Sequence, residues 1–151
     1  MRTVHFFGLD AETRNQVAKG FSDKMGGFFC TDRELPTAST ESPFARWLRT
    51  IGTVASRNNV ELYIPSGYFP TLEARAQFRD NPDQYANTMS VWVDTVDEAD
   101  ALPPTPVPNA PSDFKWEKPS EDEYHFVITK SMGSIDSMIA QVVLQYERHF
   151  S

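Results

Sequence analysis

Hydrophobic and polar positions alternate along this chain in a repeating way. Short runs rich in β-branched and aromatic residues are typical of buried strands, and they fall at 3–7, 28–31, 60–64, 89–93 and 124–129. Apolar residues at three- and four-residue spacing predict helices over 11–25, 44–57, 71–79 and 134–150. Strands that alternate with helices form parallel sheets. We therefore predict one α/β domain over 1–151, with a five-stranded parallel sheet and helices on both faces.

Local signals sharpen some of these boundaries. Asp10 is a good N-cap for the first helix, and Gly26-Gly27 predicts its end. The sequence Pro65-Ser66-Gly67 predicts that the third strand ends at Ile64.

The segment 96–119 breaks the pattern, because it is acidic and rich in proline. Its prolines exclude a regular helix and favour an extended, polyproline-like surface loop before the last strand. Such a loop can wrap a partner protein, or it can be a tethered surface loop with no partner. Phe114 and Trp116, near its end, either contact that partner or anchor the loop to the domain, and we favour anchoring. The candidate partner-binding prolines are Pro103, Pro104, Pro106 and Pro108.

Composition excludes several classes of protein. The net charge of −7 disfavours nucleic acid as a partner, because that requires a basic surface. No apolar run is long enough to span a membrane, and no signal-peptide core is present. Cys30 has no second cysteine to pair with, so we expect a reducing cytoplasmic compartment. The three histidines are scattered along the chain, which predicts no metal site.

The turn after the first strand stands where a phosphate-binding loop would lie. A working loop reads Gly-x-x-x-x-Gly-Lys-Ser/Thr and surrounds a phosphate with backbone N–H groups. Gly8 fits the first position, but Thr13, Arg14 and Asn15 replace the second glycine, the lysine and the hydroxyl residue. A nucleotide would therefore have to be bound by Gly8, Thr13, Arg14 and Asn15.

Acidic residues in the same turn argue against that nucleotide site. Asp10 and Glu12 lie where the anion would rest. A carboxylate about 4 Å from a phosphate charge opposes binding by on the order of 4 kcal/mol at an effective dielectric near 20. We therefore favour Asp10 as a helix cap and Arg14 as a solvated or ion-paired surface residue.

In their order, these segments resemble the adenylylsulfate-kinase-like branch of the P-loop kinases, including its small bacteriophage versions. The similarity rests on short matches spread over nearly the whole chain: Phe7-Gly8-Leu9 with Val17-Ala18-Lys19, Asp32 after the second strand, Ile51-Gly52, Pro70, Arg75, Val93-Asp94-Thr95 and Trp116-Glu117. It implies the sheet described above, and phosphate transfer from ATP with Mg²⁺.

The resemblance also assigns roles to particular residues. It implies that Asp32 helps to hold metal or substrate, and that Arg46, Arg49 and Arg75 lie near the acceptor site as an anion pocket. For Asp32 we favour an acid in a turn, and for the arginines ordinary ion pairs. In active members a lid with arginines occupies the place of 96–119, which here contains no arginine.

The losses of loop glycine, loop lysine and lid arginines predict a catalytically inactive domain with a degenerate loop and no cofactor. We expect it to be a protein-binding or assembly module, whose partner is another protein or its own copies. The phage-like resemblance implies a virion component or a modulator of a host protein, in the virion or the host cytoplasm. The alternative is an adenylylsulfate or nucleotide kinase that uses ATP and Mg²⁺ through Arg14, with Asp32 and Arg75 as catalytic residues and Arg49 in its acceptor pocket.

Overall fold

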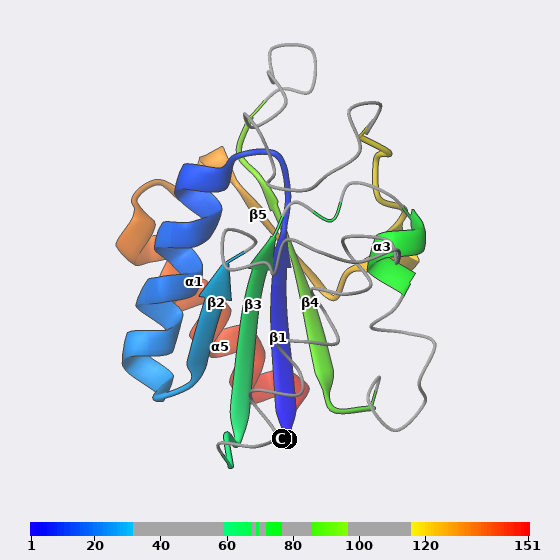
Figure 1. The fold of residues 1–151 in the computed structure, drawn as a ribbon. Helices are drawn as coiled ribbons and strands as arrows, with labels where there is room; N and C mark the ends of the chain where they lie inside the picture. The colour runs from blue at the N-terminus through cyan, green and yellow to red at the C-terminus, as the bar shows by residue number, and fades with distance from the viewer. Residues whose placement is uncertain (32–58, 68, 70–71, 77–85, 97–115) are drawn as a thin grey trace.

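A computed structural model describes residues 1–31, 59–67, 69, 72–76, 86–96 and 116–151. Five parallel strands form one sheet in the order β2-β3-β1-β4-β5 (Figure 1). The strands are β1 (Arg2–Phe7), β2 (Phe28–Thr31), β3 (Leu62–Gly67), β4 (Thr88–Asp94) and β5 (Phe126–Thr129). The helices are α1 (Ala11–Met25), α3 (Leu72–Ala76) and α5 (Ile135–His149), with short 3-10 turns η2 (Glu121–Glu123) and η3 (Lys130–Met132).

Helices cover both faces of this sheet. Figure 1 shows α1 and α5 side by side on one face and α3 on the other. The predicted five-stranded parallel sheet with helices on both faces is therefore confirmed. The predicted helix over 44–57 lies outside the described residues.

The main core lies between the sheet and the pair α1 and α5. Alternate residues of a strand point to opposite faces, and Val4 and Phe6 of β1 point to this one. They pack in one cluster with Val17 and Phe21, the predicted apolar stripe of α1. A Cβ added at Gly20 would lie 2.2 Å from Ile139 Cδ1, so this glycine lets α1 and α5 approach closely.

The opposite face of β1 is aromatic and polar. His5 is fully buried there, with its ring centroid 5.3 Å from that of Phe7 and 5.5 Å from that of Phe69. Arg75 of α3 lies over the Phe7 ring at 5.4 Å. The two faces of the sheet therefore differ in chemistry.

The boundaries of α1 and β3 test the local signals. Asp10 accepts a hydrogen bond from the Thr13 N–H, and Gly26 ends the helix with a left-handed φ of 75°, so both predicted caps are confirmed. The predicted end of the third strand at Ile64 is wrong, because β3 continues to Gly67. Pro65 aligns with Cys30 and Gly67 with Phe7, and pairing on both sides outweighs the one N–H that proline lacks.

Candidate functional site

The carboxyl ends of β1, β3 and β4 form the edge of the sheet where ligands of open α/β folds bind. Phe7 at the end of β1 aligns with Gly67 of β3 and with Trp92 of β4. The turn that follows β1 leads directly into α1. The predicted phosphate site therefore falls at this edge.

The turn between β1 and α1 is too short to be a phosphate-binding loop. Such a loop runs from its first glycine to its lysine before the helix is established. Here α1 already begins at Ala11, three residues after Gly8. Ala11 and Thr13 belong to the first helical turn, so their N–H groups follow the helix axis and do not encircle a ligand.

Gly8 has a packing role in this turn. Its φ is +144°, a conformation that side chains rarely adopt. A Cβ at this position would lie 2.4 Å from the Val93 carbonyl oxygen of β4. The close approach of the turn to β4 therefore explains the glycine without a phosphate.

The Asp10 carboxylate lies at the N-terminus of α1, where an anion would bind. Its Oδ1 accepts a hydrogen bond from the Thr13 N–H at 3.1 Å, and its Oδ2 accepts one from the Thr95 hydroxyl at 2.8 Å. Burial raises the pKa of Asp10, but the hydrogen bonds from Thr13 and Thr95 and the charge of Arg14 outweigh it and lower the pKa. The site thus contains a charged group of the protein itself.

Arg14 is buried, with 1% of its surface exposed, so its prediction as a surface residue is wrong. Its Nε donates to the Ser66 hydroxyl at 3.0 Å, and Nη1 donates to the Gly8 carbonyl at 2.6 Å. Ser66 in turn donates to Asn15 Oδ1 at 2.7 Å. We call Gly8, Arg14, Asn15 and Ser66 the loop network. Protein oxygens satisfy donors of the guanidinium, which allows an arginine to be buried here.

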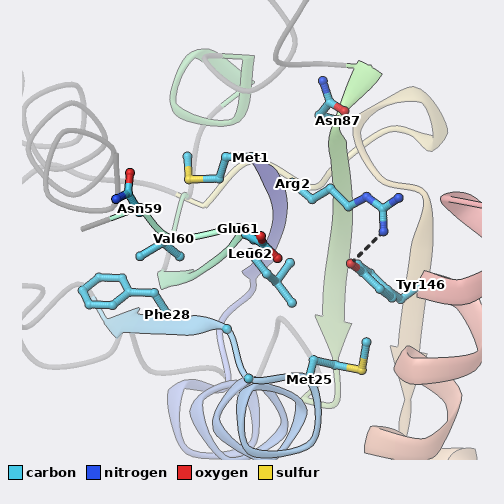
Figure 2. Close-up of a pocket in the computed structure, with 12 residues that line it drawn as sticks. Met1, Arg2, Met25, Phe28, Asn59, Val60, Glu61, Leu62, Asn87 and Tyr146 are labelled. Carbon is cyan, nitrogen blue, oxygen red and sulfur yellow. Dashed lines mark hydrogen bonds between the residues drawn. The ribbon is translucent and has the colours of Figure 1, made fainter. Parts of the chain in front are cut away.

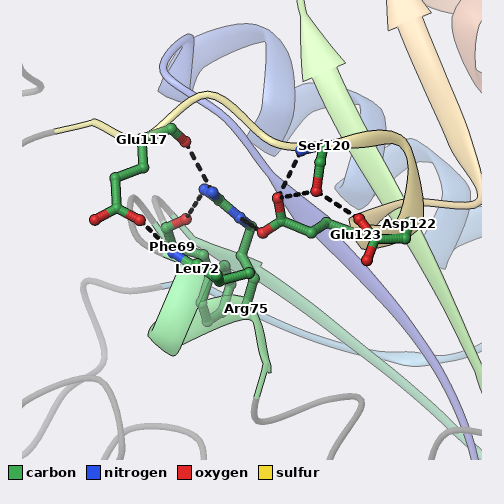
Figure 3. Close-up of polar contacts among 7 residues, drawn as sticks. All are labelled: Phe69, Leu72, Arg75, Glu117, Ser120, Asp122 and Glu123. Carbon is green, nitrogen blue, oxygen red and sulfur yellow. Dashed lines mark hydrogen bonds and ion pairs between the residues drawn. The ribbon is translucent and has the colours of Figure 1, made fainter.

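A second polar cluster surrounds Arg75 (Figure 3). Its Nε donates to Glu123 Oε1 at 2.8 Å, in an ion pair whose side chains are 1% and 3% exposed. Nη1 donates to the Phe69 carbonyl and Nη2 to the Glu117 carbonyl, both at 2.8 Å. The guanidinium also lies 5.3 Å from the Trp116 ring centroid. We call Arg75, Trp116, Glu117 and Glu123 the Arg75 clamp.

The carboxylates of the clamp are also bound to backbone. Glu117 Oε2 accepts from the Leu72 N–H at 2.9 Å, and Glu123 Oε2 accepts from the Ser120 N–H at 2.6 Å. Burial raises the pKa of Glu123, but the hydrogen bonds from Arg75 and Ser120 outweigh it and lower the pKa. The clamp therefore fastens residues 116–123 to α3.

Sequence reasoning assigned no functional or structural role to Glu117 or Glu123. The pattern Ser120-x-x-Glu123 is a capping box, and it was the signal available for Glu123. Trp116 contacts Arg75, as expected of an anchor.

The remaining predicted site residues stay predictions. Asp32, Arg46, Arg49, Phe114 and the candidate prolines of 103–108 lie outside the described residues. Of the others, Arg14 is part of the loop network and Arg75 part of the clamp, so the structure places them in two different networks. Within the described ranges, no group of three or more His, Cys, Asp or Glu could hold a metal. In that same part of the chain, no helix combines the length and apolar character that a membrane span needs.

A hollow of about 1160 Å³ lies at the other end of the sheet, where β1 and β3 begin (Figure 2). Arg2 and Tyr146 form part of its wall, and the Arg2 guanidinium donates to the Tyr146 hydroxyl at 3.2 Å. Open α/β folds bind ligands at the carboxyl ends of their strands, so this hollow does not coincide with the predicted site. The rest of its wall is formed by Met1, Met25, Gly26, Gly27, Phe28, Asn59, Val60, Glu61, Leu62 and Asn87.

Comparison with known proteins places the fold. No protein-family model and no curated protein matches the chain. Among solved structures it is similar to a sugar kinase from Janibacter sp. HTCC2649, with a TM-score of 0.63 and 16% identity over 97% of this chain and 95% of that one. It is also similar to a gluconokinase from Sinorhizobium meliloti 1021, with a TM-score of 0.61 and 9% identity over 97% of this chain and 92% of that one. For a hexameric APS kinase from Thiobacillus denitrificans, the TM-score is 0.58 and the identity 18%, over 97% of this chain and 28% of that one. At such identities the similarity shows the fold alone, and that fold is the one of the P-loop kinases.

Proposed function

We propose that this domain, built on the fold of the P-loop kinases, transfers no phosphate and acts as a protein-binding or assembly module. One observation carries the proposal: Arg14, at the lysine position, is buried and donates to Gly8 and Ser66. In a working loop the lysine reaches the β- and γ-phosphates of the nucleotide. Arg14 would have to leave two buried hydrogen bonds to do the same.

Two further features support the same proposal. The Asp10 carboxylate accepts hydrogen bonds at the helix N-terminus, where it would repel a phosphate. Segment 96–119 contains no arginine, whereas cationic groups that neutralise the transferring phosphoryl group are a large part of this catalysis. The phosphates of ATP would therefore be repelled by the Asp10 carboxylate, and segment 96–119 would supply no arginine to neutralise them.

Segment 96–119 is the proposed partner-binding element. The described residues at its two ends are fastened: Thr95 donates to Asp10, and Trp116 and Glu117 belong to the Arg75 clamp. Proline-rich segments lose little entropy on binding and dock into aromatic grooves. Its excess of acid favours a partner whose groove has basic borders.

The resemblance to bacteriophage members offers two settings for such a module. In one, the partner is a further copy of this chain or another protein of a virion. In the other, the partner is a host protein whose activity the domain modulates. The oligomeric state of the purified chain separates self-assembly from binding to a different protein.

The alternative function is an ATP-dependent small-molecule kinase. It requires Arg14 to release Gly8 and Ser66, and it requires Asp10 to release Thr13 and Thr95. These four hydrogen bonds favour the module over the kinase.

Phosphate transfer from radiolabelled ATP tests the proposal against this alternative. The acceptors would be adenylylsulfate, nucleoside monophosphates and sugars, each with Mg²⁺ and an active P-loop kinase as control. We expect no product above the level seen without protein. Turnover that Arg14→Ala abolishes would overturn the proposal and establish the kinase.

A matched pair of chains tests the binding role. In the variant, residues 97–111 are replaced by a glycine-serine linker of the same length, which leaves Thr95 and the Arg75 clamp intact. We expect native mass spectrometry or quantitative capture to find a stoichiometric protein partner, or self-association, for the unsubstituted chain alone. Equal binding by both chains would contradict the assigned role of this segment.

A further inference from the structure

Two of the three histidines lie side by side at the β4–β5 edge of the sheet. His125 directly precedes β5, and His149 is the last residue of α5. Their ring centroids are 4.6 Å apart, and their planes meet at 63°. Although the two residues are far apart in sequence, the fold brings both rings to the same strand, β4.

His125 is bound to β4 through its ring and through its backbone. The Ser90 N–H donates to His125 Nδ1 at 2.9 Å, and the His125 N–H donates to the Ser90 carbonyl at 2.8 Å. The aligned residues of β4 and β5 begin one position later, with Val91 and Phe126. The imidazole therefore accepts the hydrogen bond of a β4 backbone N–H just before the strand pairing starts. A nitrogen that accepts must carry no proton, so this contact requires a neutral ring.

His149 is bound to the same strand in a way that does not depend on its charge. Its Nε2 lies 3.0 Å from the Thr88 carbonyl oxygen, which can only accept, so Nε2 donates. Both the neutral and the protonated ring can make this bond. The contact of His149 with Thr88 therefore does not require a neutral ring, whereas the contact of His125 with Ser90 does.

Burial and neighbouring charge oppose protonation of His125. Burial, and then the charge of His149 on α5, lower the pKa of His125. The charge of His125 also acts on His5 of β1, whose pKa is lowered well below the usual value by burial, then by His125 and by Arg75. The ring centroids of His149 and Phe150 are 4.7 Å apart, and the Arg2 guanidinium lies 4.9 Å from the Phe150 ring centroid.

On the element of His125 itself, neighbouring groups are engaged elsewhere. The Glu123 carboxylate is paired with Arg75, and the Tyr124 ring packs against Trp92.

We propose that His125, with His149 beside it, forms an acid-sensitive latch that holds the start of β5 against β4. The latch is closed while His125 is neutral. When His125 gains a proton, Nδ1 becomes a donor that faces the Ser90 N–H, and the hydrogen bond is lost. Histidines titrate at higher pH than carboxylates, so the β4–β5 edge loosens before Asp10 and Glu123 lose their charges.

Amide hydrogen exchange of Ser90, followed by NMR on the full chain, tests the latch. As the pH falls from about 7.5 through the lowered pKa of His125, we expect the protection factor of this amide to fall about tenfold or more, in step with protonation of the ring. In His125→Asn, the amide oxygen can accept from Ser90 but does not titrate. Protection in that variant should stay flat over the same range. A fall of the same size in His125→Asn would overturn the proposal.

His149→Gln tests whether the charge of His149 acts on His125, an effect that a purely structural role of His149 would not produce. Its amide nitrogen can still donate to Thr88, but it cannot become charged. We expect the pKa of His125, read from its imidazole nitrogen shifts, to rise toward the usual value, and the loss of Ser90 protection to move to higher pH with it. An unchanged pKa of His125 would overturn the coupling. This comparison uses the natural His125, so it decides the matter even if His125→Asn does not fold.

Discussion

The guanidinium of Arg14 donates a hydrogen bond to the carbonyl oxygen of Gly8 at 2.6 Å. These two residues stand at the lysine and first-glycine positions of a phosphate-binding loop. In a working loop the lysine contacts the phosphates of a nucleotide, whereas here Arg14 at the lysine position contacts the backbone of the loop itself.

Arg14→Lys should destabilise the domain without creating a nucleotide site. An ammonium cannot reproduce the forked contacts to Gly8 and Ser66, and buried partners would be left unsatisfied. We expect a loss of about 2–3 kcal/mol in the free energy of unfolding, measured with urea. Lys19→Arg on the exposed side of α1 is the matched control, and it should change stability by less than about 0.5 kcal/mol. A stable Arg14→Lys variant that binds Mg-ATP would contradict this account of the loop.

Gly8→Ala should be more damaging than the same substitution at Gly26, at the other end of α1. Its Cβ would lie 2.4 Å from the Val93 carbonyl oxygen, and its φ of +144° suits glycine alone. We expect a loss of at least about 2 kcal/mol, measured by thermal and urea unfolding. Gly26 also has a positive φ, but a Cβ added there would have no neighbour within 4 Å. For Gly26→Ala we therefore expect a loss of about 1 kcal/mol in the free energy of unfolding. Equal losses at the two sites would mean that β4 does not press on the turn.

The Arg75 clamp should behave as a buried ion pair. Glu123→Gln leaves the Arg75 charge without its counter-ion, and we expect a loss of about 3–5 kcal/mol. In a double-mutant cycle with Arg75→Met, the second substitution should recover part of that loss. Asp23→Asn, at the exposed Lys19–Asp23 pair, should change stability by less than about 1 kcal/mol. Additive losses at Arg75 and Glu123 would show that the pair is not coupled.

Stability should fall in two stages as the pH is lowered. The lowered pKa values of His5 and His125 mean that these rings stabilise the fold above about pH 6.5, and that this contribution is lost as the pH falls below that value. The lowered pKa values of Asp10 and Glu123 add a contribution that is present above about pH 4 and is lost below it. Urea midpoints measured across this range check both stages. In Asp10→Asn the lower stage should shrink, and an unchanged lower stage would contradict the role of this carboxylate.

The fold could be predicted from the sequence because local and long-range signals agree. Helix α1 is predicted both by its apolar stripe, Val17 and Phe21, and by its caps, Asp10 and Gly26. In the structure the stripe packs in the core and both caps are formed. Pro65 is different, because its local tendency to end a strand is overridden by pairing with neighbours on both sides.

The candidate site could be predicted only in part. Residue types predicted Asp10 as a cap, which the structure confirms, but they indicated a surface position for Arg14, which is buried. Its burial depends on Ser66, 52 residues away, whose hydroxyl is placed by the extension of β3. Arg75 likewise needs Glu123, 48 residues later, as its partner. Such pairs arise from tertiary structure and have no local pattern.

Isothermal titration calorimetry of the purified domain with Mg-ATP tests the central claim most directly. An active P-loop kinase in the same buffer serves as the positive control. The loop network and the Asp10 carboxylate predict no heat beyond dilution with nucleotide up to about 1 mM, which corresponds to binding weaker than about 4 kcal/mol. A dissociation constant in the micromolar range would contradict the account, since it would require Arg14 to leave Gly8 and bind phosphate.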